Sequence, residues 1–158
     1  MRKTIVRKNE RSWAIDLITV ANQILTKNNL FIKKVGGEST ISTNESKSMF
    51  PDVILYGDLE QTIILQGWEL KMPDVAIEDE AFVKDAQRKA RALNLNSCLI
   101  WNFTYAVLYV KDENDKFNIV KQWNDTNFIH TREDVFLYRK EWESLLENIL
   151  FEVNEYFL

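Results

Sequence analysis

The chain has 158 residues, of which 46% are apolar and 28% are charged, and its net charge is -4. This balance is typical of a single globular domain and excludes collagen-like, low-complexity and membrane-spanning classes. The single cysteine, Cys98, excludes an internal disulfide, and the N-terminal segment lacks the apolar run of a signal peptide, so we expect a soluble cytoplasmic protein.

A helix and three strands are expected in the first half of the chain. Apolar side chains recur at spacings of three and four from residue 9 to about residue 27, which predicts an amphipathic helix. Runs rich in Val, Ile and Leu predict strands, and the turn at Gly57 favours a hairpin between the second and third of them. Residues 36–48 are polar and predict a loop. The three strands are expected at residues 31–35, 50–56 and 62–71.

The second half predicts one more helix and strand, then a hairpin and a final helix. Helical spacing returns at residues 78–93, and a nearly continuous apolar run at 97–103 predicts a strand covered on both faces. Strands at 105–110 and 117–123 are expected to form a second hairpin, and one long amphipathic helix is expected at 133–157. This order predicts an α/β domain with an α-β-β-β-α-β core and a mixed sheet.

Three residues of the first predicted hairpin indicate metal chemistry. Glu69 and Lys71 are two residues apart on a strand, so their side chains point to the same face. Asp52 begins the preceding strand, and antiparallel pairing would bring it beside Glu69. Two neighbouring carboxylates oppose each other's ionisation, and a hard cation such as Mg²⁺ removes that conflict. A lysine beside the metal can orient water or stabilise charge on a scissile phosphate.

The spacing of these residues resembles that of a known superfamily. Pro51-Asp52, sixteen intervening residues and then Glu69-Leu70-Lys71 resemble the signature of the PD-(D/E)XK nucleases. The expected element order over residues 9–103 is similar to their core, with the hairpin at 105–123 and the helix at 133–157 appended. The resemblance implies a restriction-endonuclease-like fold. Within the superfamily, the chain most resembles Mrr-like and type I or IIG restriction-enzyme nuclease domains.

The resemblance also implies a role for individual residues. Members of the superfamily often place a glutamate of the first helix at the metal and a glutamine on the helix after the Glu-x-Lys strand. That glutamine is often followed four residues later by Tyr, whereas Arg91 stands at this position here. The implied roles are metal ligation by Asp52, Glu69 and Glu10, and catalysis by Asp52, Glu69, Lys71 and Gln87.

A basic stripe is predicted on the same helix. Lys84, Arg88 and Arg91 follow one another at spacings of four and three, so they share one helix face and are candidates for contact with DNA phosphates. The resemblance implies double-stranded DNA as the substrate and Mg²⁺ as the cofactor, with Mn²⁺ as a substitute. The acidic overall charge argues against binding of nucleic acid through charge alone.

Each of these features also has a plainer explanation. The aspartate after Pro51 could cap a turn, the two strand charges could face solvent, and Glu10 could be favoured by the helix dipole. Gln87 and the basic stripe could be ordinary solvated helix positions. His130, the only histidine, is assigned no role.

The function expected from the sequence is that of a metal-dependent endonuclease that hydrolyses DNA phosphodiester bonds. Residues 1–158 would form one nuclease domain of a longer restriction enzyme, fused to or associated with a methyltransferase, translocase or specificity module, because no base-reading motif is evident. Two alternatives stay open: a non-catalytic DNA-binding or assembly domain of the same fold, and a resolvase of the Holliday-junction type.

Overall fold

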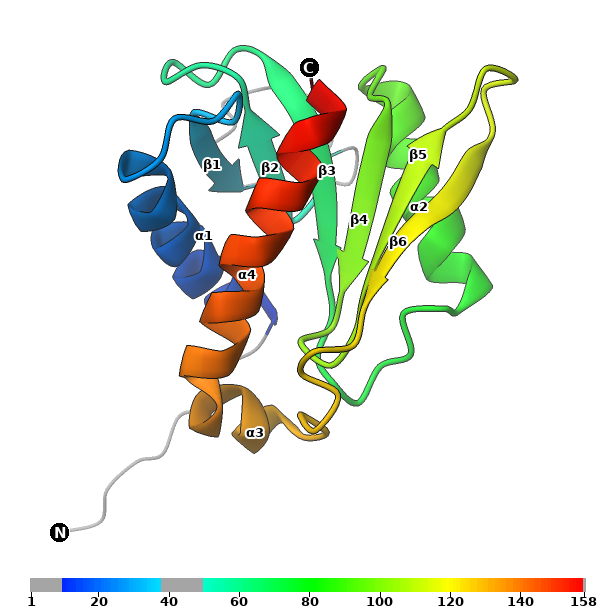
Figure 1. Ribbon diagram of the computed structural model, residues 1–158. Helices are drawn as coiled ribbons and strands as arrows, with labels where there is room; N and C mark the ends of the chain where they lie inside the picture. The colour runs from blue at the N-terminus through cyan, green and yellow to red at the C-terminus, as the bar shows by residue number, and fades with distance from the viewer. Residues whose placement is uncertain (1–9, 38–49, 158) are drawn as a thin grey trace, which may run out of the picture.

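The computed structural model describes residues 10–37 and 50–157 and contains a six-stranded sheet between two helical layers (Figure 1). The predicted α/β class and mixed sheet are therefore confirmed. In chain order the elements are α1 (Glu10–Thr26), β1 (Lys34–Gly37), β2 (Val53–Tyr56), β3 (Ile64–Leu70), α2 (Glu80–Ala92), β4 (Ser97–Trp101), β5 (Ala106–Lys111), β6 (Phe117–Trp123), α3 (Arg132–Leu137), α4 (Arg139–Asn154) and the 3-10 turn η3 (Glu155–Phe157).

The strands lie in the sheet in the same order as in the chain, β1 to β6. Four of the five pairings are antiparallel, and both predicted hairpins, β2–β3 and β5–β6, are present. The exception is the parallel pair β3–β4, which α2 connects as a crossover. A parallel pair needs such a crossover because its strands cannot be joined by a tight turn. The carboxyl ends of β3 and β4 consequently lie at the same edge of the sheet.

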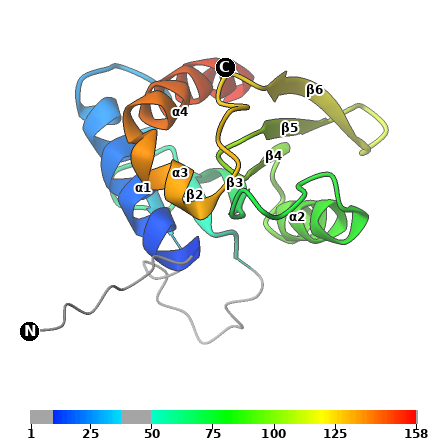
Figure 2. The same cartoon turned by 90° about the horizontal axis from the view of Figure 1, so that it is seen from below.

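Helices lie on both faces of the sheet (Figure 2), and an apolar layer packs between the sheet and the helices on each face. The larger layer packs α1 and α4 on one face and centres on Trp142, whose ring contacts those of Trp13 and Trp101 edge-to-face with centroids 6.2 and 6.3 Å apart. The smaller layer packs α2 on the other face through Ala86 and Ala90. Every residue of β4 is buried, as expected for a strand that is covered on both faces.

The first strand begins later than the sequence predicts. Residues 31–35 were expected to form it, but β1 starts at Lys34 and includes Gly36 and Gly37, which were expected to begin the loop. The reason is tertiary: the backbone N–H groups of Phe31 and Ile32 donate to Oδ1 of Asn154 on α4, at 2.8 and 3.3 Å. The remainder of the expected loop, residues 38–48, lies outside the described residues.

The helix expected at 133–157 is interrupted at Tyr138. A capping box at Thr131 and Asp134 starts α3, and Tyr138 (φ -105°, ψ 36°) ends it before α4 begins. The Val135 carbonyl, which a continuous helix would pair with a backbone N–H one turn later, accepts the indole N–H of Trp142 at 2.8 Å. No proline or glycine marks this break, so the sequence carries no local signal for it.

Gly67 determines how the chain enters β2. A Cβ atom at Gly67 would lie 2.2 Å from Cγ of Pro51, so the proline ring sits directly on the glycine backbone of β3. We expect Gly67→Ala to lower the free energy of unfolding by about 1–3 kcal/mol, because the ring must move to admit the methyl group. Urea unfolding would measure the loss.

Gly57→Ala is the matched control for that substitution. Its nearest atoms would lie at 3.4 Å, an ordinary van der Waals contact, so stability should change little. Equal stability losses in the two variants would contradict the close packing of Pro51 on β3.

Candidate functional site

The candidate site lies where β3 ends, beside the end of its parallel neighbour β4. The backbone N–H of Lys71 donates to the Trp101 carbonyl at 2.9 Å, which extends the β3–β4 pairing to the sheet edge. Asp52 immediately precedes β2, and its Oδ2 accepts the backbone N–H of Leu70 at 2.9 Å. The antiparallel register, with Val53 opposite Trp68, brings Asp52 alongside Glu69. The expected approach of the two carboxylates across the hairpin is therefore present.

Glu69 points away from the aromatic layer and toward α2. It is 6% exposed, and its neighbours Trp68 and Leu70 belong to the opposite apolar layer. Its Oε1 lies 3.0 Å from Nζ of Lys89, which is also 3.3 Å from Oδ2 of Asp85 one helical turn earlier. A buried strand carboxylate is thus paired with a buried helix ammonium, which in turn pairs with a half-buried aspartate.

This pairing does not fully compensate the carboxylates. Burial, reinforced by the Asp52 carboxylate, raises the pKa of Glu69 to about 8, although Lys89 acts in the opposite direction. Burial also acts to lower the pKa of Lys89, but Glu69 and Asp85 outweigh it, and the pKa of Lys89 is raised. At Glu69, burial and the Asp52 carboxylate thus outweigh the ammonium of Lys89, whereas Asp85 is also paired with Arg88 at 2.7 Å.

Two further charged residues lie near Asp52 and Glu69: Lys71, which directly follows β3, and Glu10, at the start of α1. Nζ of Lys71 lies 4.4 Å from the centroid of the Phe82 ring on α2, so the lysine projects to the same side of the sheet as Glu69. Glu10 is the first residue of α1. Burial raises its pKa, Lys71 acts to lower it and Asp52 to raise it, so these three charges lie within electrostatic reach of one another.

Gln87 and the basic stripe lie on α2, and Arg88 of the stripe contacts the charged group through Asp85. Gln87 is half-buried, and its side chain makes no hydrogen bond to another described residue. Lys84 pairs with Glu80 at 2.9 Å, and Arg88 pairs with Asp85 at 2.7 Å. These exposed pairs lower the positive charge that the helix face offers to DNA phosphates.

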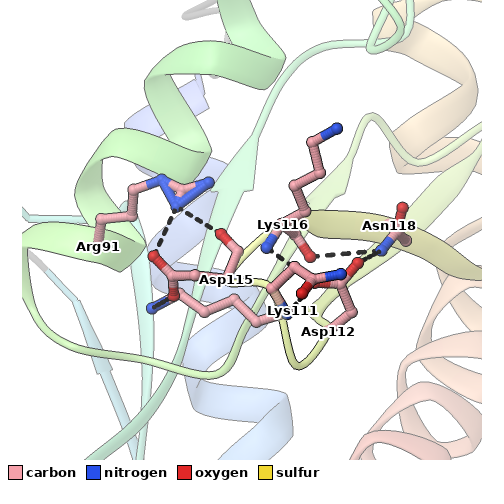
Figure 3. Close-up of polar contacts among 7 residues, drawn as sticks. Arg91, Lys111, Asp112, Asp115, Lys116 and Asn118 are labelled. Carbon is pink, nitrogen blue, oxygen red and sulfur yellow. Dashed lines mark hydrogen bonds and ion pairs between the residues drawn. The ribbon is translucent and has the colours of Figure 1, made fainter.

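Arg91, the third member of the stripe, is bound to the β5–β6 turn (Figure 3). Its Nη1 lies 3.2 Å from the backbone carbonyl and 3.7 Å from Oδ2 of Asp115, and its guanidinium lies over the Phe117 ring at 4.8 Å. Lys111 also pairs with Asp115, at 3.0 Å. Arg91 therefore joins α2 to the second hairpin, a structural role that the helix spacing alone does not reveal.

Lys89 and Asp85 are the site residues that sequence analysis missed. A signal was present, because Phe82, Ala86 and Lys89 follow one another at spacings of four and three, so Lys89 is a charge on the apolar face of α2. Asp85 precedes it by four residues, the spacing of an intrahelical ion pair. Their pairing with Glu69 could not be read from the sequence, because it requires α2 to pack over β3.

The donor set suits a hard cation such as Mg²⁺ or Mn²⁺. Within the described part of the chain, no group of three or more His, Cys, Asp or Glu side chains is placed to hold a metal ion. Two carboxylates, Asp52 and Glu69, nevertheless converge, and Mg²⁺ is commonly bound through one or two carboxylates while it keeps several waters. Asp52 and Glu69 are therefore the residues of this group that could hold such a cation, with Lys89 already paired to one oxygen of Glu69.

A cavity of about 270 Å³ opens at the same edge of the sheet. It lies between the loops that follow β3 and β4, and the Asn102 side chain supports it by donating to the Val75 carbonyl at 2.8 Å and accepting the Tyr105 N–H at 2.8 Å. The described lining residues include Asp74, Thr104 and His130. The cavity gives the edge a polar recess next to the charged group.

No family model, curated protein or solved structure matches this chain. Within residues 10–37 and 50–157, no helix combines the length and the apolar character that crossing a bilayer requires. The assignment of function consequently depends on the residues of the site and on the resemblance of their spacing.

The raised pKa of Glu69 predicts a pH-dependent stability. A raised folded-state pKa contributes stability that is complete below the ordinary value of 4.5 and is lost as the pH rises through about 8. Glu69→Gln removes this dependence. Without metal, the stability of this variant relative to the native chain should therefore rise between pH 5 and 8.5, by up to about 4 kcal/mol.

Urea unfolding in EDTA at the two pH values would measure this difference. Glu113→Gln, in the exposed turn of the second hairpin, is the matched control and should show no such trend. A relative stability of Glu69→Gln that stays constant with pH would contradict the buried, charge-crowded position of Glu69.

Proposed function

We propose that this chain is a metal-dependent endonuclease that hydrolyses DNA phosphodiester bonds and has the restriction-endonuclease-like fold that its sequence resembles. The observation that carries the proposal is the convergence of Asp52, Glu69 and Lys71 at the end of β3. The element order around them, a helix, three strands, a helix and a strand, agrees with the core expected for that superfamily.

Each residue has a role that its position supports. Asp52 is held by the Leu70 N–H through Oδ2, which leaves Oδ1 for a metal, and Glu69 would be the second ligand. Glu10 lies within electrostatic reach as a further contributor. The bound metal would lower the pKa of a coordinated water and neutralise charge on the scissile phosphate. Lys71, on the same side of the sheet, would orient the attacking water or stabilise the negative charge that develops on the phosphate.

The proposed substrate is double-stranded DNA, bound by this domain without strong sequence preference. Lys84, Arg88 and Arg91 stay candidates for phosphate contacts, but each already has a carboxylate partner that DNA would have to replace. A surface with few available cations binds DNA with modest affinity, and this affinity depends only weakly on salt concentration. A methyltransferase, translocase or specificity module is therefore proposed to bring the nuclease to its site.

Removal of either carboxylate should abolish cleavage while preserving the fold. Asp52→Asn keeps an oxygen that can accept the Leu70 N–H, and Glu69→Gln keeps the shape of the side chain, so both chiefly remove a metal-binding charge. We expect a rate loss of roughly 100-fold or more with Mg²⁺ or Mn²⁺. Nicking of supercoiled plasmid, with EDTA as the blank, would measure the cleavage rate. Full activity in either variant would contradict the proposal.

Lys71→Met tests the third role. The lysine is not a metal ligand, so its loss should lower the cleavage rate by about 100- to 1000-fold and leave Mn²⁺ affinity nearly unchanged. Single-turnover cleavage together with a Mn²⁺ titration separates the two quantities. If the variant only weakened DNA binding in a salt-dependent way, Lys71 would be a phosphate contact instead.

A non-catalytic DNA-binding or assembly domain of the same fold is the second candidate. The pairing of Glu69 with Lys89 favours it, because an ammonium already neutralises part of the charge that a metal would use. Binding of duplex DNA without nicking of plasmid or branched substrates, at any Mg²⁺ or Mn²⁺ concentration, would support this candidate over the nuclease.

A further inference from the structure

Lys89 is held between two carboxylates of different elements. Its Nζ lies 3.0 Å from Glu69 Oε1 on β3 and 3.3 Å from Asp85 Oδ2 on α2. The side chain of Lys89 is only 11% exposed, so its position is fixed by packing as well as by charge. A solvated surface lysine would not be restrained in this way, because exposed ion pairs are weak and mobile.

The ammonium lies where a cation shared by Glu69 and Asp85 would have to lie. In phosphodiesterases with two metals, the ions lie roughly 3.5–4 Å apart and stabilise the attacking and leaving oxygens together. Here Asp52 and Glu69 would hold a first ion, and Glu69 Oε1 with Asp85 Oδ2 is the carboxylate pair that could hold a second. Lys89 already engages both of these oxygens.

Building on the proposed function, we propose that Lys89 takes the place of the second metal ion, so that the site operates with a single divalent cation. The ammonium neutralises the outer side of Glu69 and repels another cation from it. It also fixes the Glu69 carboxylate against α2, which leaves the side that faces Asp52 for the one metal. Lys89 is thus a positioning residue and does not itself contact the substrate.

Counting bound Mn²⁺ on the full 158-residue chain tests this inference without an activity assay. Calorimetric titration, supported by electron paramagnetic resonance of free Mn²⁺, should give one ion per native chain. Lys89→Met should raise the count to two, because Glu69 Oε1 and Asp85 Oδ2 lose the ammonium that lies between them, while Arg88 pairs with Asp85 through Oδ1 and leaves Oδ2 available. Adding Asp85→Asn to Lys89→Met should return the count to one, since a ligand of the second ion is then removed.

Two matched variants control for the loss of charge and for packing. Lys84→Met removes an exposed lysine from the same helix, and the count should stay at one. Lys89→Arg keeps the positive charge, so the number of bound Mn²⁺ ions should also stay at one. If Lys89→Met does not fold, as judged by circular dichroism, Lys89→Gln replaces it, because an uncharged polar side chain suits the charged surroundings and also removes the ammonium.

The outcomes separate this inference from the proposed function. Two ions on the native chain, or one ion on the folded Lys89 variant, would overturn the single-metal inference and leave the nuclease proposal intact. No Mn²⁺ on the native chain at millimolar concentration would overturn the metal site itself, and the proposed function with it. One ion on the native chain and two on Lys89→Met would establish the inference.

Discussion

A strand that is covered on both faces has little water with which to hydrate a charge, and β3 nevertheless carries a buried glutamate. Moving an ionised carboxylate out of water is costly unless nearby groups compensate it. The structure meets this constraint with Lys89 on α2, which is itself held by Asp85. The compensation is incomplete because Glu69 is buried and Asp52, just before β2, adds a second carboxylate, so the pKa of Glu69 remains raised. Buried groups with perturbed pKa values are more often found at functional sites than elsewhere.

The position of α2 follows from the parallel pairing of β3 and β4. A crossover connection has to cross one face of the sheet, and here it carries α2 across the face to which Glu69 points. The same pairing places the ends of β3 and β4 at one edge, where Lys71 and the cavity beside Asn102 lie. The topology of the sheet thus determines both the cation that stabilises Glu69 and the open edge from which a substrate could approach.

Contacts elsewhere in the fold position the elements that meet at this edge. Gly67 lets Pro51 pack directly on β3, so Asp52 enters the site at a fixed register, and its bond to the Leu70 N–H secures it. On the opposite face, the aromatic cluster around Trp142 anchors α4 and α1 against the sheet. The link from Arg91 to Asp115 ties α2 to the second hairpin. Residues far from the site therefore fix the elements that carry it.

The sequence by itself determined the element types and the approach of Asp52 to Glu69. Hydrophobic periodicity and a hairpin register are local properties, and both depend on residues close together in the chain. The late start of β1, the break at Tyr138 and the partners of the basic stripe were decided by tertiary contacts with Asn154, Trp142 and Asp115. Lys89 is the clearest case. Periodicity marks it as a charge on an apolar face, but only the packing of α2 over β3 gives that charge its partner, because Coulomb energy depends on distance in space and not along the chain.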